Sequence, residues 1–263
     1  MSMTLTLGPG PLGTQPGGAF NFDFNGAPKH RIYFEPYLRR IRALVGGEVV
    51  LDTVRGQLLH ESNHLPMLYV PLEDLRGLEP SDHTTHCPFK GDASYFHLAG
   101  IENAVWTYEE PIDTASWLKG HGSLYHHKAD AWFVEDERVF GKLRDPYHRV
   151  DVFESSRPVT VTAGREVIAR SERAKLLFET GLPAVAYVPG ADVEAGALAP
   201  SDKRTGCPYK GEARYWNVRD IADGAWSYEA PLPEAALVAR HVAFWGEGIE
   251  VAIDEPADRF SLG

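Results

Sequence analysis

A Cys-Pro-aromatic-Lys-Gly motif occurs twice and carries the residue types most able to do chemistry in this chain. One copy runs from Cys87 to Gly91 and the other from Cys207 to Gly211, with Lys90 and Lys210 in fourth place. Proline and glycine favour a rigid turn that can direct a Cys and a Lys into one small volume. A nearby ammonium lowers the pKa of a thiol, which activates it as a nucleophile. The motif predicts either a reactive or ligand-binding thiol or, more simply, a turn that joins two strands.

Other side chains that occur in both halves of the sequence could complete such a site. We expect His121 and His241 to be candidates for proton transfer. Arg55 and Arg173 could clamp a carboxylate or phosphate, although a surface ion pair is the commoner role of such arginines. Aromatic residues could fill a core or form a wall for a planar ligand; they are Tyr95, Trp106 and Tyr108, matched by Tyr215, Trp226 and Tyr228.

Histidines are concentrated in the first half of the chain. His83 and His86 precede Cys87 with a spacing that metal ligands can adopt. Lys203 and Gly206 stand at the corresponding places in the second half, and zinc sites need three or four ligands. We therefore predict no metal site, and the sequence identifies no cofactor.

Internal repetition organises the whole chain. Residues 81–98 match residues 201–218 at an offset of 120, and upstream the offset is 118, where Glu61 matches Glu179. The sequence thus predicts a Gly/Pro-rich leader over residues 1–28, a first repeat over 29–140 and a second over 145–256. Because the linker is short, we expect the repeats to pair within the chain about a pseudo-twofold axis.

Alternating apolar residues between Gly, Pro and Asp clusters predict short strands in each repeat, as in residues 159–162, 184–188 and 249–253. Two segments instead suggest helices: residues 171–179, with an N-cap serine and apolar residues three and four apart, and residues 233–240. The predicted fold class is mainly β, an α+β arrangement with short helices, in two tandem copies of one compact domain.

The second copy reads Thr205-Gly-Cys-Pro-Tyr-Lys-Gly211 and Ala225-Trp-Ser-Tyr228, and the first reads Thr85-His-Cys-Pro-Phe-Lys-Gly91 and Val105-Trp-Thr-Tyr108. These segments resemble the domain-of-unknown-function family 427, which also carries a nucleotidyltransferase label. The resemblance covers nearly all of the chain after the leader and implies a compact, mostly β domain, here in tandem.

Nucleotidyl transfer needs paired carboxylates that hold metal ions beside a Gly-Ser turn. The nearest candidate is Gly122-Ser123 followed by Asp130, but Trp132 stands where the second carboxylate is needed. The residues therefore argue against this chemistry.

Composition restricts the partners. The formal net charge is −11, and no basic run offers a footprint for phosphates, so we expect no nucleic-acid partner. No apolar stretch is long enough for a bilayer, and no signal peptide is visible, so we expect a cytoplasmic protein with reduced thiols and no membrane association.

These observations predict a protein that binds a small polar molecule in a pocket lined by Arg, Cys, Lys, Tyr and Trp. Two alternatives remain open. One is a structural or protein-interaction module whose recurring residues only shape the fold. The other is an enzyme that uses cysteine or transfers nucleotidyl groups, with Cys87 and Cys207 as nucleophiles assisted by Lys90 and Lys210.

Overall fold

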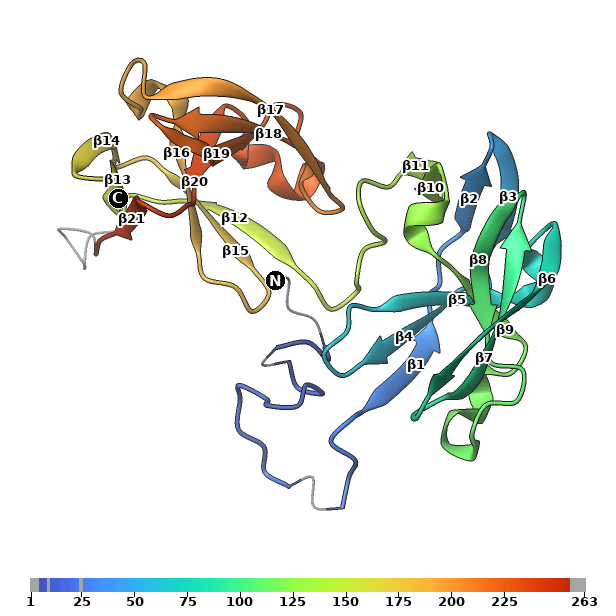
Figure 1. Ribbon diagram of the computed structural model, residues 1–263. Helices are drawn as coiled ribbons and strands as arrows, with labels where there is room; N and C mark the ends of the chain where they lie inside the picture. Colours follow the sequence, from blue (N-terminus) through green and yellow to red (C-terminus); the bar gives the residue numbers. More distant parts are fainter. Residues whose placement is uncertain (1–4, 9, 24–25, 256–263) are drawn as a thin grey trace. The chain divides into compact units, whose positions relative to one another are not determined.

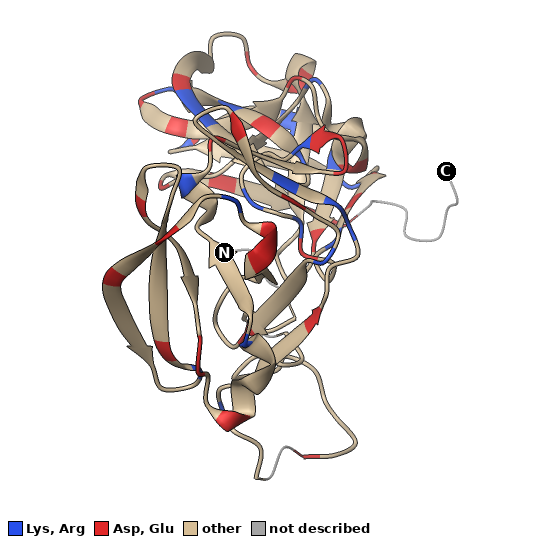
Figure 2. Cartoon of the chain, turned by 90° about the vertical axis from the view of Figure 1, so that its right-hand side faces the viewer, with Lys and Arg blue, Asp and Glu red and all other residues tan. Residues whose placement is uncertain are grey.

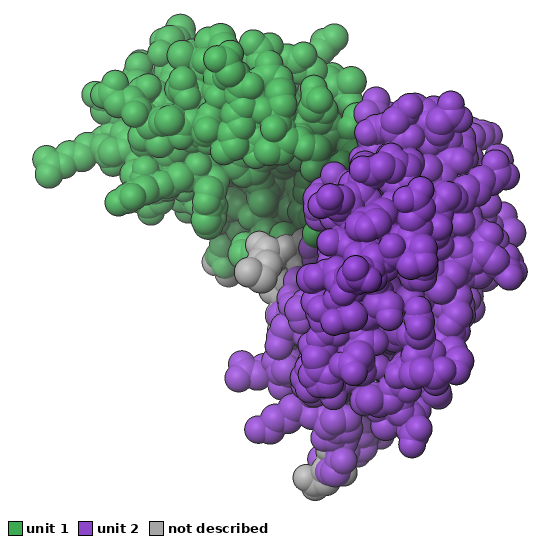
Figure 3. Space-filling model, turned by 45° about the vertical axis from the view of Figure 1, so that its right-hand side comes forward, with its two compact units in different colours: residues 1–3, 140–263 green, residues 4–139 purple. Residues whose placement is uncertain are grey.

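The computed structural model describes residues 5–8, 10–23 and 26–255. The chain divides into two compact units, with the boundary between Val139 and Phe140 (Figures 1 and 3). Each unit contains one repeat, and the strands occur in nearly the same order in both. The predicted fold class is confirmed: both repeats are mainly β, with short 3₁₀ helices between strands.

In the first repeat the strands are β1 (Ile32–Pro36), β2 (Ile41–Val45), β3 (Glu48–Thr53), β4 (Gln57–Glu61), β5 (Met67–Pro71), β6 (Leu78–Cys87), β7 (Gly91–Leu98), β8 (Ile101–Thr107), β9 (His121–Leu124), β10 (Ala131–Val134) and β11 (Glu137–Arg138). The 3₁₀ helices of this repeat are η1 (Leu72–Asp74), η2 (Asp113–Leu118) and η3 (His126–Lys128).

In the second repeat the strands are β12 (Val150–Glu154), β13 (Val159–Ala163), β14 (Glu166–Ser171), β15 (Lys175–Glu179), β16 (Val185–Pro189), β17 (Leu198–Cys207), β18 (Gly211–Val218), β19 (Ile221–Tyr228), β20 (His241–Phe244) and β21 (Ile249–Ile253). The 3₁₀ helices are η4 (Gly190–Asp192) and η5 (Pro233–Val238).

Each repeat has one large and one small antiparallel sheet. The seven-stranded sheets follow the orders β1-β4-β5-β9-β8-β7-β6 and β12-β15-β16-β20-β19-β18-β17. The small sheets follow the orders β11-β10-β2-β3 and β14-β13-β21. In both large sheets the last four strands are neighbours in sequence or nearly so, which local hairpins allow. The Cys-Pro-aromatic-Lys-Gly turn joins the two outermost of these strands.

The large sheet of the second repeat is apolar on both faces. On one face, Leu176 and Val188 belong to a cluster that they share with Val161 of the small sheet. On the other face, Leu177 and Tyr187 belong to a second cluster that includes Ala235 and Val238 of η5. Adjacent residues Leu176 and Leu177 therefore point to opposite faces of β15, and both are buried because each face is covered.

This two-sided burial explains why the predicted helix over residues 171–179 is wrong. The segment forms the strand β15 from Lys175 onward. A strand buried on both faces has consecutive apolar residues, a pattern that short sequences share with buried helices. Ser171 lies at the end of β14, and its Oγ accepts a hydrogen bond from the Arg173 N–H, as a turn residue does. The helix predicted from residue 233 is confirmed as the 3₁₀ helix η5.

The leader contacts the first repeat through its early residues. Thr6 and Leu7 are buried, and the Gly13 carbonyl accepts a hydrogen bond from Arg31 at 2.6 Å. The end of the leader has alternating aromatics at Phe20, Phe22 and Phe24, a pattern that predicts a strand docked on the fold, but Phe20 and Phe22 are exposed. Phe24, the third of them, lies outside the described residues.

Acidic and basic residues are interspersed over the strands and loops (Figure 2). Within the described residues, no helix is long and apolar enough to cross a bilayer.

Candidate functional site

The Cys-Pro-aromatic-Lys-Gly turn is a tight hairpin in both repeats. Cys87, at the end of β6, pairs with Gly91, at the start of β7, and Cys207 pairs with Gly211 in the same way. Gly91 and Gly211 adopt φ of 104° and 97°, a region that residues with a Cβ rarely enter. The motif glycine is thus required by the backbone of the turn.

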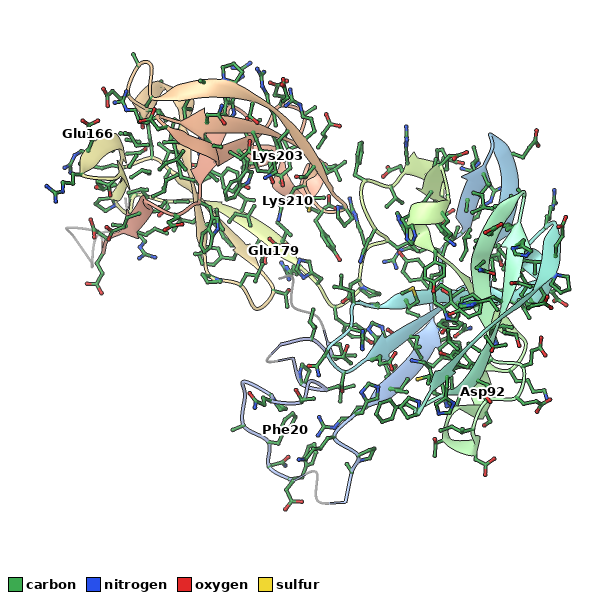
Figure 4. All side chains as sticks on the ribbon, in the orientation of Figure 1. Phe20, Asp92, Glu166, Glu179, Lys203 and Lys210 are labelled. Carbon is green, nitrogen blue, oxygen red and sulfur yellow. The ribbon has the colours of Figure 1, made fainter. Side chains whose placement is uncertain are left out.

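The lysine of each turn is buried in an ion pair. Lys90 Nζ lies 2.5 Å from Glu61 Oε2, and the two side chains are 9% and 13% exposed. In the second repeat Lys210 Nζ lies 2.6 Å from Glu179 Oε2, with the side chains 11% and 12% exposed. Figure 4 labels Glu179, which ends β15, and Lys210, which lies in the turn between β17 and β18.

A histidine completes each pair. In the first repeat the other carboxylate oxygen of Glu61, Oε1, lies 2.8 Å from His30 Nε2. In the second repeat Glu179 Oε1 lies 2.9 Å from His148 Nε2. Each glutamate at the end of an inner strand therefore joins the turn, through Lys, to the segment before the first strand, through His. We call these three residues the His-Glu-Lys triad.

The triads hold their carboxylates in the charged form. Burial on its own would raise the pKa of Glu179, but His148 and Lys210 outweigh it and lower that pKa to about 2. Burial likewise would raise the pKa of Glu61, but Lys90 and His30 outweigh burial and lower that pKa below its ordinary value. The site therefore contains an ionised glutamate at neutral pH in both repeats.

The thiols lie beside the triads without a hydrogen-bond partner among the described residues. Cys87 and Cys207 are half-buried and unoxidised. Cys87 packs against the aromatic cluster of the first repeat. The ammonium groups expected to activate them face glutamates instead, and their charge is largely balanced there.

The aromatic residues converge on the same face of each large sheet. Trp106 Nε1 donates to the Tyr69 hydroxyl at 3.0 Å, and Trp226 Nε1 donates to the Tyr187 hydroxyl at the same distance. At the rim, the Thr85 and Tyr95 hydroxyls are 3.1 Å apart, and those of Thr205 and Tyr215 are 3.2 Å apart. These residues form a polar-tipped aromatic floor next to the thiol.

Tyr108 and Tyr228 lie deepest in this group. Burial, followed by the proximity of Tyr69, Cys87 and Glu61, raises the pKa of Tyr108 above its usual range. Burial and the proximity of Tyr187, Cys207 and Tyr215 do the same for the pKa of Tyr228. Both residues are more than nine-tenths buried. Within the part of the chain that the structure describes, neither hydroxyl makes a hydrogen bond to the protein. Neither oxygen is among the fully buried unpaired polar atoms, so each reaches the surface of the site and can bind another molecule.

The two arginines lie elsewhere. Arg55 pairs with Asp74 and Glu73 of η1, and Arg173 pairs with Asp192 of η4. The structure therefore brings together Cys, Lys, Tyr and Trp of the predicted set and separates Arg55 and Arg173 from them.

The histidines of the predicted set, His121 and His241, begin β9 and β20. Their Nδ1 atoms lie 3.3 Å and 2.8 Å from the carbonyls of Lys119 and Ala239. The His121 ring contacts Phe34, which packs on Tyr69, so this histidine lies at the border of the aromatic cluster.

Sequence reasoning missed the histidines of the triads. His30 and His148 are followed by Arg31 and Arg149, and they match at the offset of 118 that aligns Glu61 with Glu179. His121 and His241 are therefore not the only histidines that recur at matching positions. Extending the upstream offset through the first strand would have found them.

The linker covers the turn of the second repeat. Arg144 Nε donates to the Pro208 carbonyl at 2.7 Å, and Arg144 also pairs with Glu234. The Asp145 N–H donates to the Tyr209 hydroxyl at 2.6 Å. In the first repeat Phe89 stands in place of Tyr209 and is 43% exposed. It packs on His30 as Tyr209 packs on His148, but it has no hydroxyl to bind a linker. The two turns thus differ in their surroundings.

The contact with the linker explains why residue 206 is a glycine. A Cβ at Gly206 would lie 3.1 Å from the Gly141 backbone nitrogen, so a larger residue would displace the linker. The matching His86 of the first repeat instead pairs with Asp92 at 2.6 Å on the exposed side of the turn.

Substituting Gly206→His should therefore loosen the linker. Overpacking costs about 1–3 kcal/mol, so the Asp145 amide, which Tyr209 holds, should exchange its hydrogen about tenfold faster or more. Hydrogen exchange read by mass spectrometry measures this. The reverse change, His86→Gly, is the matched control and should leave exchange at Asp145 unaltered; equal exchange in both variants would contradict this explanation of Gly206.

Neither the metal motif nor the nucleotidyl-transfer motif is assembled. His83 packs on Tyr95 and His86 pairs with Asp92, so they do not converge with Cys87. Within the described ranges, no group of three or more His, Cys, Asp and Glu residues is placed to hold a metal ion. Ser123 is fully buried in β9, and Trp132 is buried in β10.

Comparison with known protein families also divides the chain into two related parts. A family model described as a domain of unknown function (DUF427) matches residues 33–135 and again residues 151–255. Among curated proteins, none matches the chain. Each matched range includes one Cys-Pro-aromatic-Lys-Gly turn with its glutamate, tyrosines and tryptophan, whereas His30 and His148 lie just before the matched ranges.

Proposed function

We propose, for a chain that belongs to the domain-of-unknown-function family 427, that each repeat is a binding domain for a small polar molecule. The ligand would lie on the aromatic face of the large sheet, between the Cys-Pro-aromatic-Lys-Gly turn and the floor of tyrosine and tryptophan. Cys, Lys, Tyr and Trp of the predicted set take part. Arg55 and Arg173 do not, because acidic neighbours already bind them.

The observation that carries the proposal is the pair of Tyr108 and Tyr228 hydroxyls, which have no hydrogen-bond partner within the described part of the chain and are not fully buried. Both residues are more than nine-tenths buried among ionisable neighbours, in the same position of two repeats. A ligand that covers these hydroxyls displaces water from them and must supply hydrogen bonds in return. The tyrosines therefore favour a polar ligand over an apolar one.

The triads add support. A buried ion pair contributes little net stability compared with well-packed apolar residues of similar volume. Two such pairs, each beside a half-buried thiol, are therefore typical of a site with a function besides folding. The ionised glutamate, the lysine and the free thiol offer both acceptors and donors to a polar ligand.

Thiol protection tests the proposal. The native full-length chain is treated with iodoacetamide in the presence of acetate, inorganic phosphate or glycine, and labelling of Cys87 and Cys207 is read separately by peptide mass spectrometry. We expect at least one compound to slow labelling in a saturable way. N-Acetylcysteine controls for direct effects on the reagent.

Variants locate the effect. Tyr108→Phe and Tyr228→Phe remove only the hydroxyl and should weaken protection in their own repeat about fivefold or more, as expected for one lost hydrogen bond of about 1 kcal/mol or more. Arg55→Met, outside the site, should leave protection unchanged. The proposal fails if labelling is insensitive to all three compounds, or if the tyrosine variants protect as well as the unaltered chain.

A further inference from the structure

The aromatic floor is covered in the first repeat and uncovered in the second. Tyr95 and Trp106 are cross-strand neighbours and are each 8% exposed. Their counterparts Tyr215 and Trp226 are also cross-strand neighbours, but both are only half-buried. The same floor is therefore built twice, and the repeats differ in what lies on it.

Tyr125 is the cover in the first repeat. Its ring centroid lies 4.4 Å from that of Trp106. Burial, and then a hydrogen bond with Tyr95, raises the pKa of Tyr125 to about 12. A single side chain thus places a planar ring on the tryptophan and its hydroxyl close enough to Tyr95 to affect its own pKa.

The residue at the same position of the second repeat turns away. The backbone N–H of Trp245 donates to the Gly224 carbonyl, just as the backbone N–H of Tyr125 donates to the Ala104 carbonyl. The Trp245 side chain is nevertheless 79% exposed. Among the described residues, the aromatic ring that packs on Trp226 is that of Tyr187, edge to face, and no ring takes the place that Tyr125 has on Trp106.

We propose that the second repeat binds a small phenol on Tyr215 and Trp226, in the place that the Tyr125 side chain takes in the first repeat. This inference rests on the proposed function and specifies it: the ligand is a planar ring with a hydroxyl, and one repeat of the two is open to it. The ring stacks on Trp226, and the hydroxyl joins the hydrogen bond between Tyr215 and Thr205.

Lys203 borders this floor. Its ammonium lies 4.4 Å from the centre of the Tyr215 ring and 3.3 Å from Asp223 Oδ2. Figure 4 labels Lys203. A cation at the rim favours an electron-rich ring such as that of a phenol. In the first repeat His83 packs on Tyr95 at the corresponding place, so the floor has a polar border in both repeats.

The probe is 4-methylphenol, which is the tyrosine side chain as a free molecule. It is titrated into the ¹⁵N-labelled full-length chain, and the indole N–H signals of Trp226 and Trp106 are followed by NMR. We expect a saturable shift at Trp226 and none at Trp106. Toluene, which lacks the hydroxyl, and 4-methylcyclohexanol, which lacks the planar ring, should bind at least tenfold more weakly.

Tyr125→Ala removes the cover of the first repeat. In this variant the Trp106 signal should shift as well, and calorimetry should give two sites instead of one. Tyr125→Phe is the matched control, because its ring still covers Trp106, and it should keep one site. The titration of the unaltered chain tests the inference without either variant. The inference can therefore still be refuted if Tyr125→Ala folds poorly.

The inference is overturned if 4-methylphenol leaves Trp226 unshifted, shifts both tryptophans equally, or binds no better than toluene and 4-methylcyclohexanol. If Trp226 stays unshifted while acetate, phosphate or glycine protects a thiol, the ligand class is wrong and the proposed function stands. If Trp226 shifts and no compound protects Cys207, the phenol site stands and the proposed site at the thiol is wrong.

Discussion

Replacing Lys210 with methionine should destabilise the second repeat by about 3–5 kcal/mol, the usual cost of removing one partner of a buried ion pair. The change leaves the carboxylate of Glu179 buried with His148 as its remaining partner. For a domain of about 100 residues, 1 kcal/mol corresponds to about 4–8 °C in Tm. Calorimetry should therefore show a fall in Tm of well over 10 °C for the second repeat.

Lys203→Met is the matched control. Lys203 is 46% exposed in its pair with Asp223, and exposed pairs contribute about 0–1 kcal/mol. A second variant separates charge from packing: Glu179→Met combined with Lys210→Met should recover most of the lost stability. A loss in Lys210→Met no larger than that in Lys203→Met would show that the triad is not a buried ionic cluster.

Acid should destabilise the second repeat through the same glutamate. In the unfolded chain the pKa of Glu179 is near 4.5, and in the folded chain His148 and Lys210 lower it to about 2 against the opposing effect of burial. Because the folded-state pKa is the lower one, this stabilisation is complete above pH 4.5 and is lost as the pH falls toward 2. The shift corresponds to about 3 kcal/mol.

Urea unfolding at a series of pH values between about 2 and 6 measures this loss. Glu179→Gln cannot titrate at that position, so its stability should vary less with pH over the same interval, by about 3 kcal/mol. Glu154→Gln is the control at an exposed pair with Lys175, where solvent screens the interaction. Parallel pH profiles for Glu179→Gln and the unaltered chain would contradict the assigned ionisation.

The repeat and the β class could be predicted because both are periodic signals. The 120- and 118-residue offsets align whole strands, and alternation identifies exposed and half-exposed strands such as β13. The strand β15 was mistaken for a helix because both of its faces are covered, so Leu176 and Leu177 are apolar without alternation. Burial on two faces depends on tertiary packing, which local sequence does not contain.

The sequence predicted most of the residues that gather at the site, but it did not predict which residues they contact. The recurring Cys, Lys, Tyr and Trp residues do converge, yet Lys90 binds Glu61, which is 29 positions away in sequence, rather than its near neighbour Cys87. Likewise Arg55 binds Asp74 across a loop. Strand pairing decides these partners, and spacing along the chain does not reveal it.

Mapping by NMR tests the binding claim most directly. The ¹⁵N-labelled chain is titrated with acetate, inorganic phosphate, glycine and 4-methylphenol, and the amide and indole signals of all assigned residues are followed. The proposed site predicts that at least one compound causes saturable shifts that cluster on residues 87–91 or 207–211 and on Trp106 or Trp226. Saturable shifts centred on Arg55 or Arg173, or no saturable shift with any of the four compounds, would contradict it.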